Sequence, residues 1–245
     1  MKKKLCFAII IAFVVSLMSP AISSADSPIT STEFYVSYLD IDIVVKASKS
    51  NHIDEEIAGY LSDPENPLDV KAAVINALGW RFEGNGNADR YSDFIFGKPL
   101  EDLDFDSVPP HDLFCIGYLM VKDNYFEPER AIPVMEKACE AFPRSLTVAM
   151  IDALVKAQMY MTDDWSKMWP LVDDIIKNKD LDMDMRQEAL DIIIDYMILY
   201  KEYSIQPDER EDEYSEQPNL KQYYTTLRWL AEIFSRIING MRLFY

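Results

Sequence analysis

Residues 111–143 read HDLFCIGYLMVKDNYFEPERAIPVMEKACEAFP, and apolar residues recur in them every three or four positions in two successive stretches. This spacing places apolar side chains on one face of an α-helix, so it predicts helices over 110–122 and 128–142. No segment alternates apolar and polar residues convincingly, as a half-buried strand would. The sequence therefore predicts an all-α fold, with further helices over 32–48, 53–61, 67–82, 88–96, 146–161, 164–178, 184–203 and from Leu220 to the C-terminus.

A four-residue motif recurs at intervals of 38 positions on three of these helices. It reads Ile75-Asn76-Ala77-Leu78, then Leu113-Phe114-Cys115-Ile116, then Ile151-Asp152-Ala153-Leu154. A glycine follows the first two copies, at Gly79 and Gly117. A motif that returns at a fixed interval indicates a repeated structural unit, and small residues in it allow two helices to approach closely.

Two of the helices that follow a motif carry a proline at a similar place. These residues are Pro133 and Pro170, which are 37 positions apart. Because proline removes a hydrogen bond from a helix interior, we expect each of them to kink its helix. Two kinks at one spacing favour a shared unit over coincidence.

These features resemble the tetratricopeptide repeat, a helix-turn-helix unit of about 34 residues. The resemblance depends on Ile116, Gly117, Ala131, Met135, Ala138 and Pro143 in the second unit, and on Leu78, Gly79, Phe82 and Gly86 in the first. The unit in this chain is nearer 38 residues, and the resemblance covers residues 67–178. It implies an α-solenoid of stacked helix pairs, whose last apolar face a long C-terminal helix would cap.

The first 25 residues have the three parts of a secretory signal peptide. Lys2, Lys3 and Lys4 precede an apolar run over 5–18, and small residues lead to Ala25, after which we expect cleavage. An uncleaved anchor is the alternative, but the apolar run is short for a membrane span. The pattern predicts export, to a bacterial periplasm or outside the cell, of a single helical-repeat domain over 26–245.

The composition of the chain excludes some classes of partner. Asp and Glu number 42 against 24 Lys and Arg, which gives a net charge of −18, and 49% of the residues are hydrophobic. A chain with this apolar content can form a core. Nucleic acid is not expected as a partner, because binding to phosphates requires clustered basic side chains.

Two cysteines remain after the signal peptide, Cys115 and Cys139. An oxidising compartment permits a disulfide bond between them. Both lie among apolar residues of predicted helices, so burial as free thiols is the other interpretation.

Residues 204–245 contain two unusual segments. Residues 204–218 are rich in Asp and Glu, and we expect them to form an exposed acidic loop. The helix that follows is amphipathic and carries Arg228, Arg236 and Arg242. Such a helix can lie on a membrane surface. We favour docking against acidic parts of the same chain, so contact with a membrane is not expected once the signal is removed.

The chain shows no motif that would bind a cofactor. Its two histidines, His52 and His111, do not form a zinc-binding pair, and no phosphate-binding loop is present. Asp180, Asp182 and Asp184 alternate like the first ligands of a calcium loop, with Asp191 at the position of the last ligand. Met185 stands where that loop requires glycine, so we expect Asp184 to cap the helix that follows.

The repeat family places certain positions of each first helix on the inner, concave surface. The corresponding residues are Asn76, Trp80, Phe114, Tyr118, Asp152 and Lys156. Aromatic residues with a polar edge bind partners efficiently, although aromatic residues on helices also commonly pack in the core. We therefore expect a non-catalytic protein that binds a peptide or protein partner in the cell envelope. The alternatives are a hydrolase with paired carboxylates on a helical scaffold, or a membrane-peripheral protein attached through its last helix.

Overall fold

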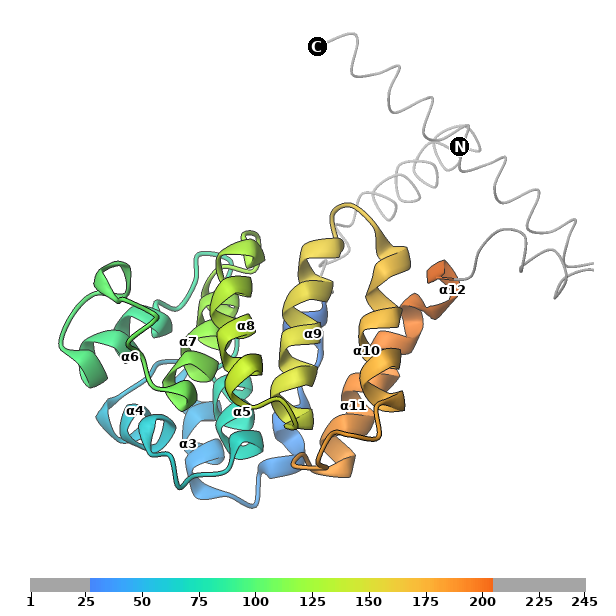
Figure 1. Ribbon diagram of the computed structural model, residues 1–245. Coiled ribbons are helices and arrows are strands. Elements are labelled where there is room, and N and C mark those ends of the chain that lie inside the picture. The colour runs from blue at the N-terminus through green and yellow to red at the C-terminus, as the bar shows by residue number, and fades with distance from the viewer. Residues whose placement is uncertain (1–26, 205–245) are drawn as a thin grey trace, which may run out of the picture.

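The computed structural model describes residues 27–204, and every regular element in this range is helical (Figure 1). The predictions for the signal peptide, for residues 205–218 of the acidic loop and for the last helix lie outside the described residues. The all-α fold is confirmed for the part described.

With η marking 3₁₀ turns, the elements are α2 (Pro28–Ser31), η1 (Phe34–Tyr38), α3 (Asp42–Ser50), α4 (Glu55–Ser62), α5 (Leu68–Ala77), α6 (Asn87–Phe96), η2 (Leu100–Asp102), α7 (Pro110–Asp123), η3 (Pro128–Arg130), α8 (Ile132–Ala141), α9 (Leu146–Tyr160), η4 (Trp165–Lys167), α10 (Met168–Lys177), α11 (Gln187–Met197), η5 (Ile198–Tyr200) and α12 (Lys201–Ser204).

Helices α7, α8, α9 and α10 follow one another side by side along the molecule, each packed against the next (Figure 1). Helix α5 contacts both α7 and α9 from the second layer, which also contains α3 and η1. The core lies between these layers. Helix α6 forms one end of the molecule, and α10, α11 and α12 form the other.

Two of the three predicted helix pairs pack as hairpins. The first predicted pair, α5 and α6, does not. Helices α7 and α8 pack together as one hairpin, and α9 and α10 as the next. Helix α6, however, packs mainly against α4 and α7, while α5 packs against α3, η1 and α7. The complete solenoid therefore stays a prediction.

The two prolines of the repeat lie at helix starts. Pro133 is the second residue of α8, and Pro170 is the third residue of α10. In each hairpin a 3₁₀ turn precedes the helix, so the backbone N–H that proline lacks is not required by the helix. The predicted kinks in two long helices are therefore wrong. In both hairpins the proline instead lies in the first turn of the second helix.

Several predicted helices, among them those over 32–48 and 67–82, are shorter in the structure. The helix expected over 32–48 is divided into η1 and α3, because the chain turns at Leu39 and becomes extended at Ile41. The helix expected over 67–82 ends at Ala77, because Gly79 has a left-handed backbone with φ of +70°. Phe82 consequently lies beyond the helix and is 69% exposed.

Hydrogen bonds join loops of successive units at separations close to the sequence spacing. Asn85 pairs with Asp123, 38 positions away, and Arg144 pairs with Asp182 at the same separation. Ser145 pairs with Asp184, 39 positions away. Each unit is therefore linked to the next at its loops as well as through helix packing.

Arg186 links the beginning of the described chain to its end. Its guanidinium donates two hydrogen bonds to the carboxylate of Asp40, at 2.6 and 3.1 Å, and stacks over the ring of Tyr38. The hydroxyl of Tyr38 in turn donates to Asp69 on α5 at 3.0 Å. Because the hydrogen bond from Arg186 stabilises the charged carboxylate, it lowers the pKa of Asp40.

Within residues 27–204, no helix has both the length and the apolar character needed to cross a membrane.

Gly117 allows α7 and α8 to approach closely, as its position in the motif suggested. A Cβ atom at this residue would lie 2.7 Å from the sulfur of Met135 and 3.3 Å from its backbone nitrogen. Gly59 on α4 is the opposite case, since a Cβ there would meet no atom within 4 Å.

We predict opposite effects for alanine at these two glycines. Gly117→Ala overpacks the α7–α8 contact and should lower the free energy of unfolding by about 1–3 kcal/mol. Gly59→Ala fills open space in a helix and should raise it by about 0.5–1 kcal/mol, because alanine is the better helix former. Urea unfolding followed by circular dichroism measures both. Equal effects of the two substitutions would contradict the close approach at Gly117.

Candidate functional site

Four of the six residues predicted for a binding groove are buried, namely Asn76, Phe114, Tyr118 and Asp152. Phe114 and Tyr118 are fully buried, and Asn76 is 4% exposed. The side-chain nitrogen of Asn76 donates to the carbonyl of Thr32 at 3.0 Å and to the Tyr118 hydroxyl at 3.1 Å. Its oxygen accepts from the backbone N–H of Tyr35 at 3.1 Å. The groove position assigned to Asn76, Phe114 and Tyr118 is corrected, because all three are buried. The hydrogen bonds of Asn76 join the N-terminal segment to α5 and, through Tyr118, to α7.

Asp152 and Lys156 form an ion pair on α9. The Lys156 amine lies 2.7 Å from one oxygen of Asp152 and 3.8 Å from Glu136 on α8. Burial raises the pKa of the Asp152 carboxyl, and the hydrogen bond from Lys156 opposes that effect. Both predicted groove residues therefore face α8 and contribute to the α8–α9 contact.

Two of the three alternating aspartates, Asp182 and Asp184, bind groups of the protein itself. Asp184 accepts from the Ser145 hydroxyl at 2.5 Å and from the backbone N–H of Thr147 at 2.8 Å. Asp182 pairs with Arg144. Within residues 27–204, no group of three or more acidic, His or Cys side chains is arranged to hold a metal ion. The predicted cap is also corrected, because Asp184 caps the start of α9, whereas α11 begins only at Gln187.

Cys115 and Cys139 are both free thiols in the structure. Cys115 is fully buried on α7, and its sulfur lies 3.6 Å from the Leu61 carbonyl oxygen, to which it donates. Burial raises the pKa of each thiol to about 12. Neither group is therefore a thiolate nucleophile at neutral pH.

Lys71 and His111 form a partly buried pair near Cys115. Lys71 on α5 is fully buried, and its amine lies 3.2 Å from Nδ1 of His111 at the start of α7. Burial lowers the pKa of Lys71, and burial together with the Lys71 charge lowers the pKa of His111. An ammonium group has only donors, so Nδ1 of a neutral His111 accepts the hydrogen bond. This pair supports the packing of α5 on α7.

The feature that most resembles a binding site lies at the α6 end of the molecule, where two loops meet. The carboxylate of Asp123, at the end of α7, accepts hydrogen bonds from the backbone N–H groups of Asn85 at 3.2 Å and Ala88 at 2.7 Å. Gly84 has a φ of +78°, and a Cβ there would lie 2.6 Å from the Asp123 carbonyl oxygen. Glycine therefore allows the loop before α6 to contact the end of α7 directly.

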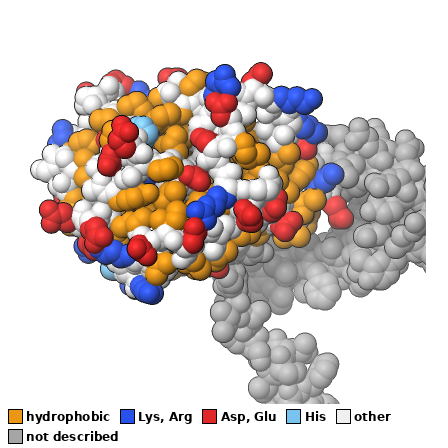
Figure 2. Space-filling model, turned by 90° about the horizontal axis from the view of Figure 1, so that it is seen from below, with side chains coloured by type: hydrophobic (Ala, Val, Ile, Leu, Met, Phe, Trp, Pro, Cys, Tyr) orange, Lys and Arg blue, Asp and Glu red, His pale blue; other side chains and the backbone are white. Residues whose placement is uncertain are grey.

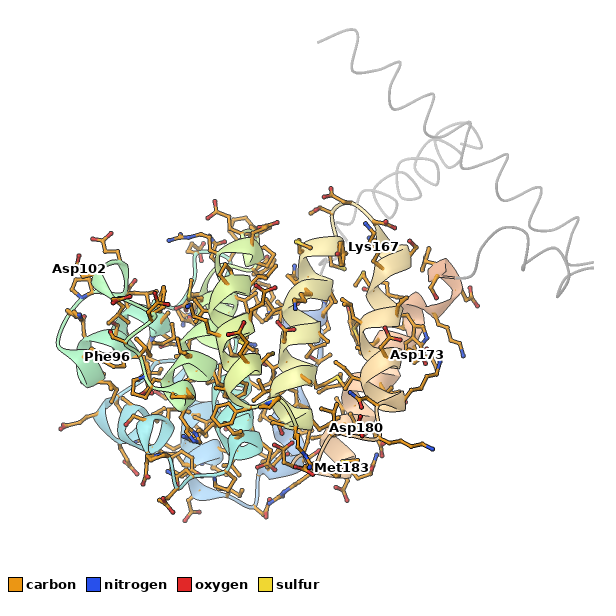
Figure 3. The ribbon with its side chains drawn as sticks, viewed as in Figure 1. Phe96, Asp102, Lys167, Asp173, Asp180 and Met183 are labelled. Carbon is orange, nitrogen blue, oxygen red and sulfur yellow. The ribbon has the colours of Figure 1, made fainter. Side chains whose placement is uncertain are left out.

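A cavity of about 540 Å³ opens beside this contact, between α6, η2, the end of α7 and η3. Asp102 of η2 is labelled at this end of the molecule in Figure 3. The apolar lining consists of Ala88, Pro99, Leu100, Leu103, Phe105 and Met120. The polar and charged lining consists of Glu83, Asp89, Glu101, Asp123, Asn124, Glu127 and Arg130, with Gly84 and Gly86 completing the wall. We call this cavity the acidic pocket.

Aromatic rings from the same two loops lie next to the acidic pocket. Phe82 and Phe126 pack edge to face with their centroids 5.2 Å apart, although they are 69% and 57% exposed. Tyr125 packs against both Phe126 and Trp80, at 4.2 and 5.3 Å. Trp80 is therefore the one predicted groove residue that belongs to a surface cluster. Sequence reasoning missed Phe82 as a surface residue because its spacing fits the helix predicted over 67–82, and it missed Phe126 because this residue lies in a loop.

Negative charge prevails around the acidic pocket. Glu83, Glu101 and Glu127 are exposed carboxylates, and the one cation in the lining, Arg130, lies 3.8 Å from Glu127. Asp123 differs from them because it is largely buried. Burial raises the pKa of its carboxyl, while the backbone N–H groups that it accepts from oppose that effect. The site therefore combines exposed aromatic surface with an unneutralised acidic rim.

Comparisons with protein-family models, with curated proteins and with solved structures found no match to this chain. The tetratricopeptide resemblance stays a prediction, and the site is interpreted from its own geometry.

We predict that the pKa of His111 lies below the usual value of 6.5, mainly because of burial, and that removal of the Lys71 charge reverses part of this shift. Because the folded protein binds this proton less readily than the unfolded chain, the contribution of His111 to stability is lost as the pH falls below about 6.5. In NMR titrations, the His111 pKa should rise in Lys71→Met. The difference in unfolding free energy between wild type and His111→Gln should shrink between about pH 7 and pH 5. An unchanged pKa in Lys71→Met would contradict the pairing.

Proposed function

We propose that this protein is an exported, non-catalytic interaction module. The acidic pocket and the Phe82–Phe126 pair would bind a segment of a peptide or protein partner in the cell envelope. The observation that supports this most directly is the exposure of Phe82 and Phe126, which pack edge to face and directly precede Glu83 and Glu127 of the cavity lining. Exposed aromatic side chains at a concave site are typical anchors for binding, because contact with a partner removes their apolar surface from water.

The charge around the acidic pocket favours a basic partner. Glu83 and Glu101 form no ion pair within the part of the chain that the structure describes, and Arg130 is already close to Glu127. A lysine or arginine of the partner would meet these carboxylates and could also lie over an aromatic face. An acidic partner would be repelled by them and by the net charge of −18. We therefore propose a segment with a basic side chain next to a large apolar one.

The hydrolase alternative has less support at this site. Asp123 is the buried carboxylate of the acidic pocket, and one could consider it as a general acid. Both of its oxygens, however, accept backbone N–H groups at the start of α6. Such an arrangement fits a helix cap better than a group that exchanges protons with a substrate.

Selection from a library of random peptides tests this function. The full chain without its signal segment is immobilised, and bound peptides are sequenced. We expect enrichment of lysine or arginine beside an aromatic or branched aliphatic residue. Absence of enrichment, or enrichment of acidic peptides, contradicts the proposal.

We predict that the aromatic pair supplies much of the binding energy. With a selected peptide, Phe82→Ala or Phe126→Ala should weaken affinity about tenfold, which corresponds to about 1.4 kcal/mol. Phe94→Ala is the matched control, since Phe94 is a 48% exposed phenylalanine of α6 that does not line the cavity. Fluorescence anisotropy measures all three. If Phe94→Ala weakens affinity as much as the other two substitutions, the loss comes from a general change in the folded protein and not from the aromatic pair.

We predict a separate electrostatic contribution from the rim. Glu101→Gln should weaken binding a few-fold at low salt and reduce the dependence of affinity on ionic strength, because one attractive charge is lost. Glu188→Gln removes the same charge from exposed α11, at the other end of the molecule, and should change affinity much less. If the two substitutions have the same effect, net charge rather than the acidic pocket attracts the peptide.

A further inference from the structure

The end of the molecule opposite the acidic pocket carries a second group of exposed apolar side chains. Trp165 of η4, Ile198 and Leu199 of η5, and Tyr203 of α12 form what we call the terminal face. Leu199 is 61% exposed, and the rings of Trp165 and Tyr203 pack edge to face at 5.0 Å. Lys167, labelled in Figure 3, lies at this end of the molecule.

Acidic residues alternate with the apolar residues of the terminal face. Asp195 precedes Ile198 by three positions and Leu199 by four, and Glu202 follows them at similar spacing. Residues at these spacings share one side of a helical segment. Both carboxylates are exposed, and neither forms an ion pair within residues 27–204. Figure 2, which views the molecule from below, shows apolar side chains together with acidic and basic ones over that surface. An occupant of the terminal face therefore needs apolar and basic side chains together.

The chain itself contains a segment with this composition. Residues 220–245 carry four cations, Lys221, Arg228, Arg236 and Arg242, against a single acid, Glu232. The apolar residues among them recur at helical spacing and are Leu227, Trp229, Leu230, Ile233, Phe234, Ile237, Ile238, Met241 and Phe244. The segment is thus complementary to the terminal face in both apolar character and charge.

The connection also favours binding within one molecule. The described chain ends at Ser204, directly after Tyr203 of the terminal face. Residues 205–219 can reach roughly 50 Å when extended, which allows the following segment to return to the face from any direction. A tethered segment has an effective concentration of about millimolar, well above that of a separate partner.

We propose that residues 220–245 bind the terminal face of their own chain as an amphipathic helix. Apolar side chains would cover Leu199 and its neighbours, and the arginines would lie near Asp195 and Glu202. The surface available to partners would then be the acidic pocket at the other end. This proposal is independent of the peptide-binding function, since it depends on other residues.

Photocrosslinking in the full chain without its signal segment tests the proposal. The photoreactive residue p-benzoylphenylalanine replaces Leu199, and a second sample carries it at Phe82 as the matched control at the opposite end. Equal amounts of ¹⁴N- and ¹⁵N-labelled protein are mixed with vesicles of phosphatidylglycerol and phosphatidylethanolamine and then irradiated. Mass spectrometry maps the products.

We expect crosslinks from position 199 to residues 220–245 within one isotopic form, and no such crosslinks from position 82. Ile233→Asp together with Phe234→Asp should reduce the crosslinks from position 199 at least fivefold. Crosslinks between isotopic forms would show a second copy on the terminal face, and crosslinks to lipid would show a membrane. Either of these, or the absence of crosslinks to residues 220–245, overturns the proposal.

Discussion

The candidate site depends on the hydrogen bonds that the buried carboxylate of Asp123 accepts. These bonds hold the loop before α6 against the end of α7, and Gly84 gives the contact the space it requires. A buried carboxylate is stable only when donors replace the water that it has lost. Here the donors are the N–H groups at the start of α6, where the helix dipole also favours negative charge. Phe82 and Phe126 belong to the two loops that this carboxylate joins. The hydrogen bonds of Asp123 therefore bring the two exposed rings together edge to face.

A second carboxylate caps a helix in a similar way further along the chain. Asp184 lies in the loop before α11 and accepts from Ser145 and Thr147 at the start of α9. In both cases a carboxylate 35 to 39 residues later in the chain accepts hydrogen bonds at the start of a helix, α6 for Asp123 and α9 for Asp184. Units are thus held together by charged caps at their loops in addition to apolar packing between their helices. Loops fixed in this way can carry exposed side chains in defined positions, which a binding site requires.

The sequence predicted helix packing better than loop structure. The close approach of two helices at Gly117 was predicted from its motif, because the requirement for a small residue between two helices is local and periodic. Phe82 was placed on a helix because its spacing fits one, but the left-handed backbone of Gly79 ends the helix earlier. The role of Asp123 could not be predicted, since its donors are 35 and 38 positions away and carry no pattern of their own. Tyr118 has the residue type of a binding anchor, and only the packing of a second layer shows that it is buried.

The acidic side chains of the protein have two roles, one beside buried lysines and one at the acidic pocket. Lys71 and Lys122 are buried, and burial lowers the pKa of both, that of Lys122 to about 8. Nearby acids oppose this effect: Asp112 acts on Lys71, and Glu33 and Asp123 act on Lys122. Part of the excess acid of the chain therefore compensates cations of its own core. The carboxylates of Glu83 and Glu101 have no such internal cation and face the acidic pocket, so their charge remains available to a basic partner.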